Sequence, residues 1–440
     1  MFSAIARIFR TPDLRSKILF TIGIIALYRL GSNVPAPFVH FPNVEQCLAA
    51  TAGTDGLLGL VNLFSGGALL QLSIFALGVM PYITATIITQ LLRVVIPHFE
   101  TLHQEGQAGQ SKLTQYTRYL TIALALLQSS TVVTIARSGQ LFGQTDIAAC
   151  QNLLTNDVWW AQLLIIIAMT AGTGLIMWMA ELVTEKGIGN GMSLLIFTSI
   201  AATFPSALWG IAEAKGFETF LLVLIVGLIV MTLIVFVEQS QRRVPVQYAK
   251  RMVGRRTYGG TNTYIPIKVN MAGVIPIIFA SSLLYLPMLL AQFNTPQDGS
   301  EPPAWVAWIS TYLVSGDQPL YMLVYFLLNI AFTFFYVAIT FNPVEISDNM
   351  KKYGGFIPGI RAGRPTAEYL DYVITRITFP GSLYLGIVAL IPLIALATVQ
   401  ANQNFPFGGA SILIIVGVGL ETVKQIDAQL QQRHYEGLLR

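Results

Sequence analysis

The amino-acid sequence predicts an all-α membrane protein that crosses the bilayer ten times, and three observations support this class. Charged residues make up 11% of the 440 residues, whereas an ordinary soluble domain contains about 25%. Hydrophobic residues make up 54%, which is more than the core of a soluble chain of this length would bury. The apolar residues also form long runs, and lysine and arginine are concentrated in alternate connections between them. Lipid is therefore the expected solvent for much of the chain.

The first ten residues are basic and amphipathic. Phe2, Ile5, Ile8 and Phe9 fall near one helical face, and the two arginines are turned away from it. Such a segment favours a helix that lies on the membrane surface. The apolar run that follows is long and has no small-residue cleavage site behind it, so we interpret it as a retained span rather than a signal peptide.

Ten apolar segments have about the length that a hydrocarbon core of roughly 30 Å requires. They are residues 18–38, 72–96, 119–136, 158–180, 191–212, 217–237, 270–292, 320–341, 378–400 and 407–423. The last is the weakest, because its apolar run is short and interrupted by glycine. Several of the others contain proline or glycine, which membrane helices tolerate.

The basic residues predict the orientation of these spans. Of the 26 lysines and arginines, Arg29 falls within the first span, and only Arg137 and Lys215 fall in connections on one side. The remaining 23 fall on the other side, in segments 1–17, 93–118, 181–190, 238–268, 342–377 and 424–440. The positive-inside rule assigns that side to the cytoplasm. Both chain ends are then expected to be cytoplasmic.

Two connections on the basic side are unusually long, at about 238–269 and 342–377. One interpretation of their charge is ordinary retention in the cytoplasm, which shorter loops would also achieve. In the first, pairs of basic residues alternate with β-favouring residues and turn glycines, which indicates a projecting hairpin. A basic hairpin suits an acidic or RNA-containing partner.

The sequence contains no motif that indicates an enzyme. HExxH, CxxC and G-x-S-x-G strings are absent, and the glycines of GQAGQSK lack the spacing of a phosphate-binding loop. No cofactor or metal is therefore expected. Ion-coupled carriers commonly place ionisable residues near the middle of their spans, but here the spans contain few charges: Arg29 lies late in the first span and Glu181 lies at the cytoplasmic end of the fourth.

Several long strings resemble the SecY family, in order along essentially the whole chain. They are NLFSGGALLQLSIFALGVMPYITATIITQLL (62–92), EGQAGQSKLTQYTRYL (105–120), TEKGIGNGMSLLIF (184–197), QRRVPVQYAKRMVGRR (241–256), IPIKVNMAGVIPIIFASS (265–282) and GGFIPGIRAGRPT (354–366). The resemblance implies two pseudosymmetric five-helix halves, 1–212 and 213–440, around a central pore. It also implies a channel that translocates unfolded preproteins and releases transmembrane segments laterally into the membrane.

The same resemblance assigns roles to particular residues. A plug is expected at about 57–71, including Leu63, Phe64, Ser65, Gly66 and Gly67. The pore constriction is expected to consist of Val79, Ile83, Met192, Ile196, Ile278 and Ile414, whose apolar side chains would exclude ions by dewetting. Gln128 and Asn270 match the lateral gate, and Arg255, Arg256 and Arg361 match positions that engage the motor or the ribosome.

The partners implied by the resemblance are the SecE and SecG subunits, the SecA motor ATPase, a ribosome with its nascent chain, signal peptides and preproteins, and membrane lipid. A polytopic solute carrier and a structural membrane scaffold are the alternative classes. The two cysteines, Cys47 and Cys150, both fall in connections predicted to be external, where a disulfide or two free thiols would be compatible with the environment.

Overall fold

The computed structural model describes residues 11–50, 65–137, 153–155, 158–248, 251–253, 256–258, 262–293, 303–314, 318–399 and 409–436. The amphipathic segment predicted at 1–10 lies outside these ranges, as do Leu63, Phe64, Cys150 and Arg255. The contacts divide the chain into two compact units. Unit 1 consists of residues 1–223 and 398–440, and unit 2 consists of residues 224–397.

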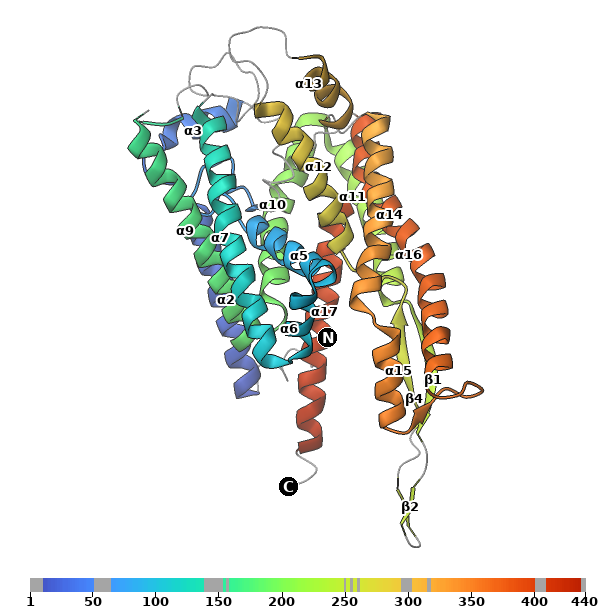
Figure 1. Ribbon diagram of the computed structural model, residues 1–440. Coiled ribbons are helices and arrows are strands. Elements are labelled where there is room, and N and C mark those ends of the chain that lie inside the picture. Colours follow the sequence, from blue (N-terminus) through green and yellow to red (C-terminus); the bar gives the residue numbers. More distant parts are fainter. Residues whose placement is uncertain are drawn as a thin grey trace. The chain divides into compact units, whose positions relative to one another are not determined.

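Unit 1 is built from helices (Figure 1). Its elements are α2 (Pro12–Ser32), α3 (Phe41–Ala50), α5 (Met80–Val95), α6 (Pro97–Gln104), α7 (Gln107–Arg137), α9 (Trp159–Lys186), α10 (Gly191–Lys215) and α17 (Gly409–Glu436). Helix α7 packs against α5 and α9, and α10 packs against α9 and α17. The start of α10 is fixed by Asn190, whose side chain accepts a hydrogen bond from the Met192 amide at 3.0 Å, as an N-cap residue does.

Unit 2 combines helices with a small sheet. Its helices are α11 (Phe217–Gln239, which begins in unit 1), α12 (Ile275–Phe293), α13 (Ala304–Ile309), α14 (Pro319–Thr340), α15 (Pro343–Lys352) and α16 (Arg364–Val399), with a π-helical turn at Ser310–Val314. Helix α12 packs against α14. The Asn342 side chain caps α15 by accepting hydrogen bonds from the amides of Val344 and Glu345.

The hairpin predicted in the first long basic connection is confirmed. Strand β1 (Gln241–Tyr248) pairs antiparallel with β4 (Asn262–Lys268), and β2 (Arg251–Val253) pairs with β3 (Arg256–Tyr258) between them. Strand β5 (Gly355–Phe356), from the second long connection, pairs with the other edge of β1. The two basic connections therefore share one three-stranded sheet, which the sequence did not predict.

Each of the ten predicted spans overlaps a helix: α2, α5, α7, α9, α10, α11, α12, α14, α16 and α17. Within the described residues, five helical segments are long and apolar enough to cross a membrane: Gln107–Arg137, Trp159–Lys186, Phe220–Gln239, Pro319–Lys352 and Arg364–Ile391. The predicted fold class is thus supported, and ten crossings remain a prediction.

The predicted start of the second span was wrong. Residues 72–79 form turns, and helix α5 begins only at Met80. The helix does not begin earlier because Leu72 and Gly78 have φ values of +48° and +54°, a left-handed conformation that a continuous α-helix cannot contain. The backbone of Leu72 and Ile74 instead bonds to the extended segment that follows α2.

Candidate channel residues

Residues 65–79 form an irregular, largely buried segment that contains the described part of the predicted plug. Ser65 is fully buried, and its hydroxyl accepts a hydrogen bond from the Leu69 amide at 3.1 Å. Gly66 and Gly67 both have positive φ values, +68° and +91°, which glycine adopts without a steric penalty. The segment is therefore ordered through its own turns rather than as the beginning of a long helix.

The residues predicted to form the constriction are distributed over both units. Val79, Ile83, Met192, Ile196 and Ile414 belong to unit 1, and Ile278 belongs to unit 2. Val79, Ile196, Ile278 and Ile414 are buried, whereas Ile83 and Met192 are partly exposed. Met192 and Ile196 lie in α10 and Ile414 lies in α17, and these two helices pack together. A closed ring of all six side chains remains a prediction.

The two residues predicted at the lateral gate differ in their surroundings. Gln128 lies partly exposed in α7. Asn270 is buried just before α12, and its amide nitrogen donates to Glu238 Oε1 at 2.6 Å and to the Gly273 carbonyl at 3.2 Å. Its amide oxygen accepts a hydrogen bond from the Gly273 amide at 3.0 Å. The polar atoms of Asn270 are thus already paired within unit 2.

Of the three residues predicted to dock partners, the structure describes Arg256 and Arg361. Arg256 is the first residue of β3, and Arg361 is exposed in the loop between β5 and α16. The Arg361 carbonyl accepts a hydrogen bond from the Thr366 hydroxyl at 2.9 Å. This bond fixes the backbone of residue 361 and does not involve its side chain. On the neighbouring β1–β4 pair, the Arg243 guanidinium lies 4.9 Å from the centre of the Tyr264 ring, a cation–π contact.

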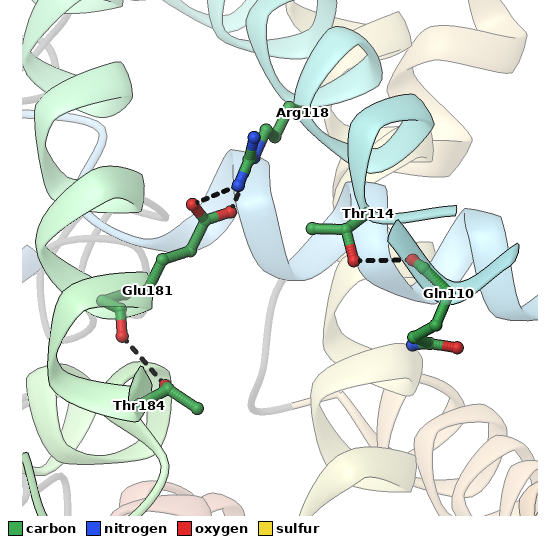
Figure 2. Close-up of polar contacts among 6 residues, drawn as sticks. Gln110, Thr114, Arg118, Glu181 and Thr184 are labelled. Carbon is green, nitrogen blue, oxygen red and sulfur yellow. Dashed lines mark hydrogen bonds and ion pairs between the residues drawn. The ribbon is translucent and has the colours of Figure 1, made fainter. Parts of the chain in front are cut away.

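An ion pair that the sequence analysis missed connects α7 and α9. Figure 2 shows Arg118 facing Glu181, with Nε and Nη2 donating to the two carboxylate oxygens at 2.9 and 2.8 Å. These residues lie 63 positions apart, so no local pattern identifies the pair. A cavity of about 410 Å³ beside it is lined by Arg118, Met177, Trp178, Glu181, Leu182 and Glu185. Among the described residues, no group of three or more His, Cys, Asp or Glu side chains is placed to hold a metal ion.

The structure also decides between the two states considered for the cysteines, because Cys47 is disulfide-bonded. Cys47 is fully buried in α3, and the backbone around it is tied to residues 153–155. The His40 amide donates to the Leu153 carbonyl and the Thr155 amide donates to the Phe38 carbonyl, both at 2.9 Å. Cys150, the other cysteine of the sequence, lies outside the described residues.

Comparison with known proteins agrees with the resemblance in the sequence. The family model described as SecY matches residues 73–423. The chain is 62% identical to the protein translocase subunit SecY of Streptomyces galbus over 444 aligned positions, 63% identical to that of Micrococcus luteus over 441, and 57% identical to that of Mycobacterium tuberculosis over 447. In each pair, 100% of both chains is covered.

Solved structures share the fold. The structure of a protein conducting channel matches with a TM-score of 0.59 and 19% identity, and Sec61 in the canine ribosome-channel complex matches with a TM-score of 0.56 and 19% identity. Each match covers 93% of this chain and 91% of the other. Identity at this level supports the fold alone, whereas the full-length relatives above 55% identity establish the family. The chain belongs to the SecY family.

Proposed function

We propose that this chain is the protein-conducting channel of a bacterial plasma membrane, with both termini in the cytoplasm. It translocates unfolded preproteins across the membrane and releases transmembrane segments laterally into the lipid. The observation that carries this proposal is the identity of about 60% to protein translocase subunits over the full length of both chains. The alternating distribution of basic residues supports the orientation.

In this proposal the channel is kept closed by apolar side chains and by the plug. Val79, Ile83, Met192, Ile196, Ile278 and Ile414 form the constriction, and residues 57–71 form the plug. Branched aliphatic side chains repel water and so exclude ions, but they move aside around a passing chain. The buried positions of Ile278 and Ile414 are compatible with such a packed seal.

Lateral release requires a seam that opens. We assign Gln128 and Asn270 to this seam, where hydrogen bonds of about 0.6–2 kcal/mol would hold it without locking it. Because Asn270 is already bonded to Glu238 and Gly273, a bond across the seam would have to replace one of these. A signal segment of about 7–15 apolar residues gains free energy by partitioning into lipid, and this gain offsets the opening of the seam.

The driving force comes from partners in this proposal. A SecA motor or a translating ribosome docks on the basic sheet and its neighbouring loop, through residues such as Arg255, Arg256 and Arg361. SecE and SecG subunits complete the complex. The exposed position of Arg361 and the β2–β3 pair, which lies at the tip of the β1–β4 hairpin (Figure 1), support a docking role.

The experiment is reconstitution of the chain with its partner subunits in a planar bilayer. The double variant Ile278→Ala with Ile414→Ala is compared with Ile165→Ala with Ile234→Ala. All four isoleucines are buried, with 7%, 3%, 1% and 1% of their surface exposed, so both pairs create similar cavities. We expect the resting ion conductance to rise only in the first pair, with preprotein transport retained in both.

Two results would contradict the proposal at different levels. If the wild-type complex does not transport preprotein when its motor is supplied, the proposed channel function is wrong. Equal resting conductance in the two variant pairs, together with normal wild-type transport, would place the seal on other residues and leave the channel function standing.

A further inference from the structure

Arg29 is a charged residue near the end of α2, within the first predicted span. A charged side chain in a span is costly and usually has a specific partner. The partly exposed Arg29 side chain donates a hydrogen bond from Nη1 to the Gly66 carbonyl at 3.1 Å. Within the part of the chain that the structure describes, this is the one hydrogen bond of the Arg29 guanidinium. The charge is therefore directed at the backbone of the segment 65–79.

The backbone of Gly66 is held between two helices. A Cβ atom on Gly66 would lie 3.0 Å from Arg29 Nη1 and 3.1 Å from Ser199 Cα, so a side chain at this position would be crowded. The φ value of +68° independently favours glycine here. Arg29 of α2 and Ser199 of α10 thus both lie close to residue 66.

The helix that carries Arg29 is itself fixed to α10. The preceding residue, Tyr28, is fully buried, and its hydroxyl forms a 2.7 Å hydrogen bond with the Ser199 hydroxyl. The Tyr28 ring also stacks on Phe75 of the irregular segment, with ring centres 5.9 Å apart. The guanidinium therefore projects from a rigid support.

The middle of the segment has its own attachment. The Ala36 amide donates to the Leu72 carbonyl and the Ile74 amide donates to the Val34 carbonyl, each at 2.9 Å. Losing the Arg29 contact would leave these two bonds in place. The contact with Arg29 thus acts on the end of the segment that lies within the proposed plug.

We propose that Arg29 anchors the resting state of the channel by holding the Gly66 backbone against α10, and that opening requires this one charged hydrogen bond to break. This inference rests on the proposed channel function. A single bond to a carbonyl is strong enough to bias the closed state and weak enough to break in each transport cycle, because hydrogen bonds to charged groups exceed neutral ones only about twofold in free energy.

The test compares Arg29→Gln and Arg29→Lys in the reconstituted complex. Loss of the bond in Arg29→Gln should raise the resting ion conductance about tenfold. It should also let a preprotein with a shortened apolar signal be transported, because less partitioning free energy is then needed to open the channel. Arg29→Lys keeps the charge but shortens the reach, so we expect an intermediate effect. Arg15→Gln is the matched control, since Arg15 is exposed at the other end of the same helix.

A second pair of variants tests the same contact from the other side and keeps the arginine. Gly66→Ala places a methyl group against Arg29 and Ser199, whereas Gly67→Ala also has a positive φ but open space around its Cβ. Because the methyl group crowds the contact with Arg29, we expect a larger rise in resting conductance for Gly66→Ala than for Gly67→Ala. The complex with Arg29→Gln could transport normal preproteins, keep the wild-type conductance and still reject the preprotein with the shortened signal. This result would contradict the proposed role of Arg29 and leave the channel function standing. Equal conductance in the two glycine variants would also overturn that role.

Discussion

Residues 65–79 in unit 1 and the sheet β4–β1–β5 in unit 2 are both non-helical, but they are stabilised in different ways. The first is mostly buried: Leu69 and Ala76 have no exposed surface, and its backbone bonds to residues 34 and 36. The sheet buries Val244 and Val246 from β1 and exposes Arg242 and Arg243. A substitution in the first region therefore changes packing, whereas a charge change on the second leaves packing intact and changes what can bind.

The largest effect is expected from reversing one exposed charge beside the sheet. Arg361→Glu should slow motor-driven preprotein translocation at least about tenfold, because like charges at an interface cost several kcal/mol. The fold should be retained, since the structural hydrogen bond of residue 361 uses its carbonyl and not its side chain. Translocation of preprotein into vesicles measures the rate. Retention of the variant in the membrane during alkaline extraction checks that it is still inserted.

Arg364→Glu is the control for this prediction. It makes the same charge change three residues later, in an exposed pair with Glu368, and we expect a smaller loss of rate. A normal rate in Arg361→Glu, or equal losses in the two variants, would argue against a specific docking role for Arg361.

An intermediate effect is expected from the buried region. A Cβ atom on Gly172 of α9 would lie 2.1 Å from the Ile74 carbonyl oxygen, so Gly172→Ala forces the segment to shift. Overpacking of this kind costs about 1–3 kcal/mol. Thermal unfolding of the purified protein, followed by tryptophan fluorescence, should show the loss of stability.

Gly174→Ala is the matched control two residues along the same helix. Its Cβ would lie 3.6 Å from Ile122 Cδ1, an ordinary contact. Because alanine favours helix over glycine by about 0.5–1 kcal/mol, this variant should be neutral or slightly stabilised. Equal destabilisation in both variants would show that the close approach of residues 72–74 to α9 is not present in solution.

The sequence predicted the helices better than it predicted the contacts between them. Long apolar runs require helices because lipid offers no partners to the backbone, so every predicted span overlaps a helix. The start of the second span failed because apolarity alone does not distinguish a helix from buried turns, and the bonds from Val34 and Ala36 that hold residues 72–74 come from a distant segment. Gly78 and Pro81 were the available signals of a break.

For the candidate site, too, the sequence predicted residues better than it predicted contacts. Candidate residues such as Gly66, Arg361 and Ile278 could be chosen from a family resemblance because they stand in recognisable strings, and their roles stay predictions. The contact between Arg29 and Gly66, the bond between Asn270 and Glu238, and the strand pairing of β1 with β5 each join residues at least 32 positions apart. Such contacts depend on tertiary packing, which periodicity and composition do not encode.

The smallest effect is expected for the Arg118–Glu181 pair, which tests whether exposure or geometry decides the strength of a contact in this protein. Its bidentate geometry favours a strong interaction. Its side chains are 49% and 25% exposed, however, and exposed ion pairs contribute only about 0.2–1 kcal/mol because water screens them. A double-mutant cycle of Arg118→Gln and Glu181→Gln, measured by thermal unfolding in detergent micelles, should give a coupling free energy within that range. Raising the salt concentration should reduce it further, as it does for solvent-exposed charges. A coupling above about 2 kcal/mol that does not change with salt would mean that the geometry outweighs the exposure. The ion pair would then belong with the buried contacts of residues 65–79 rather than with the exposed charges of the sheet.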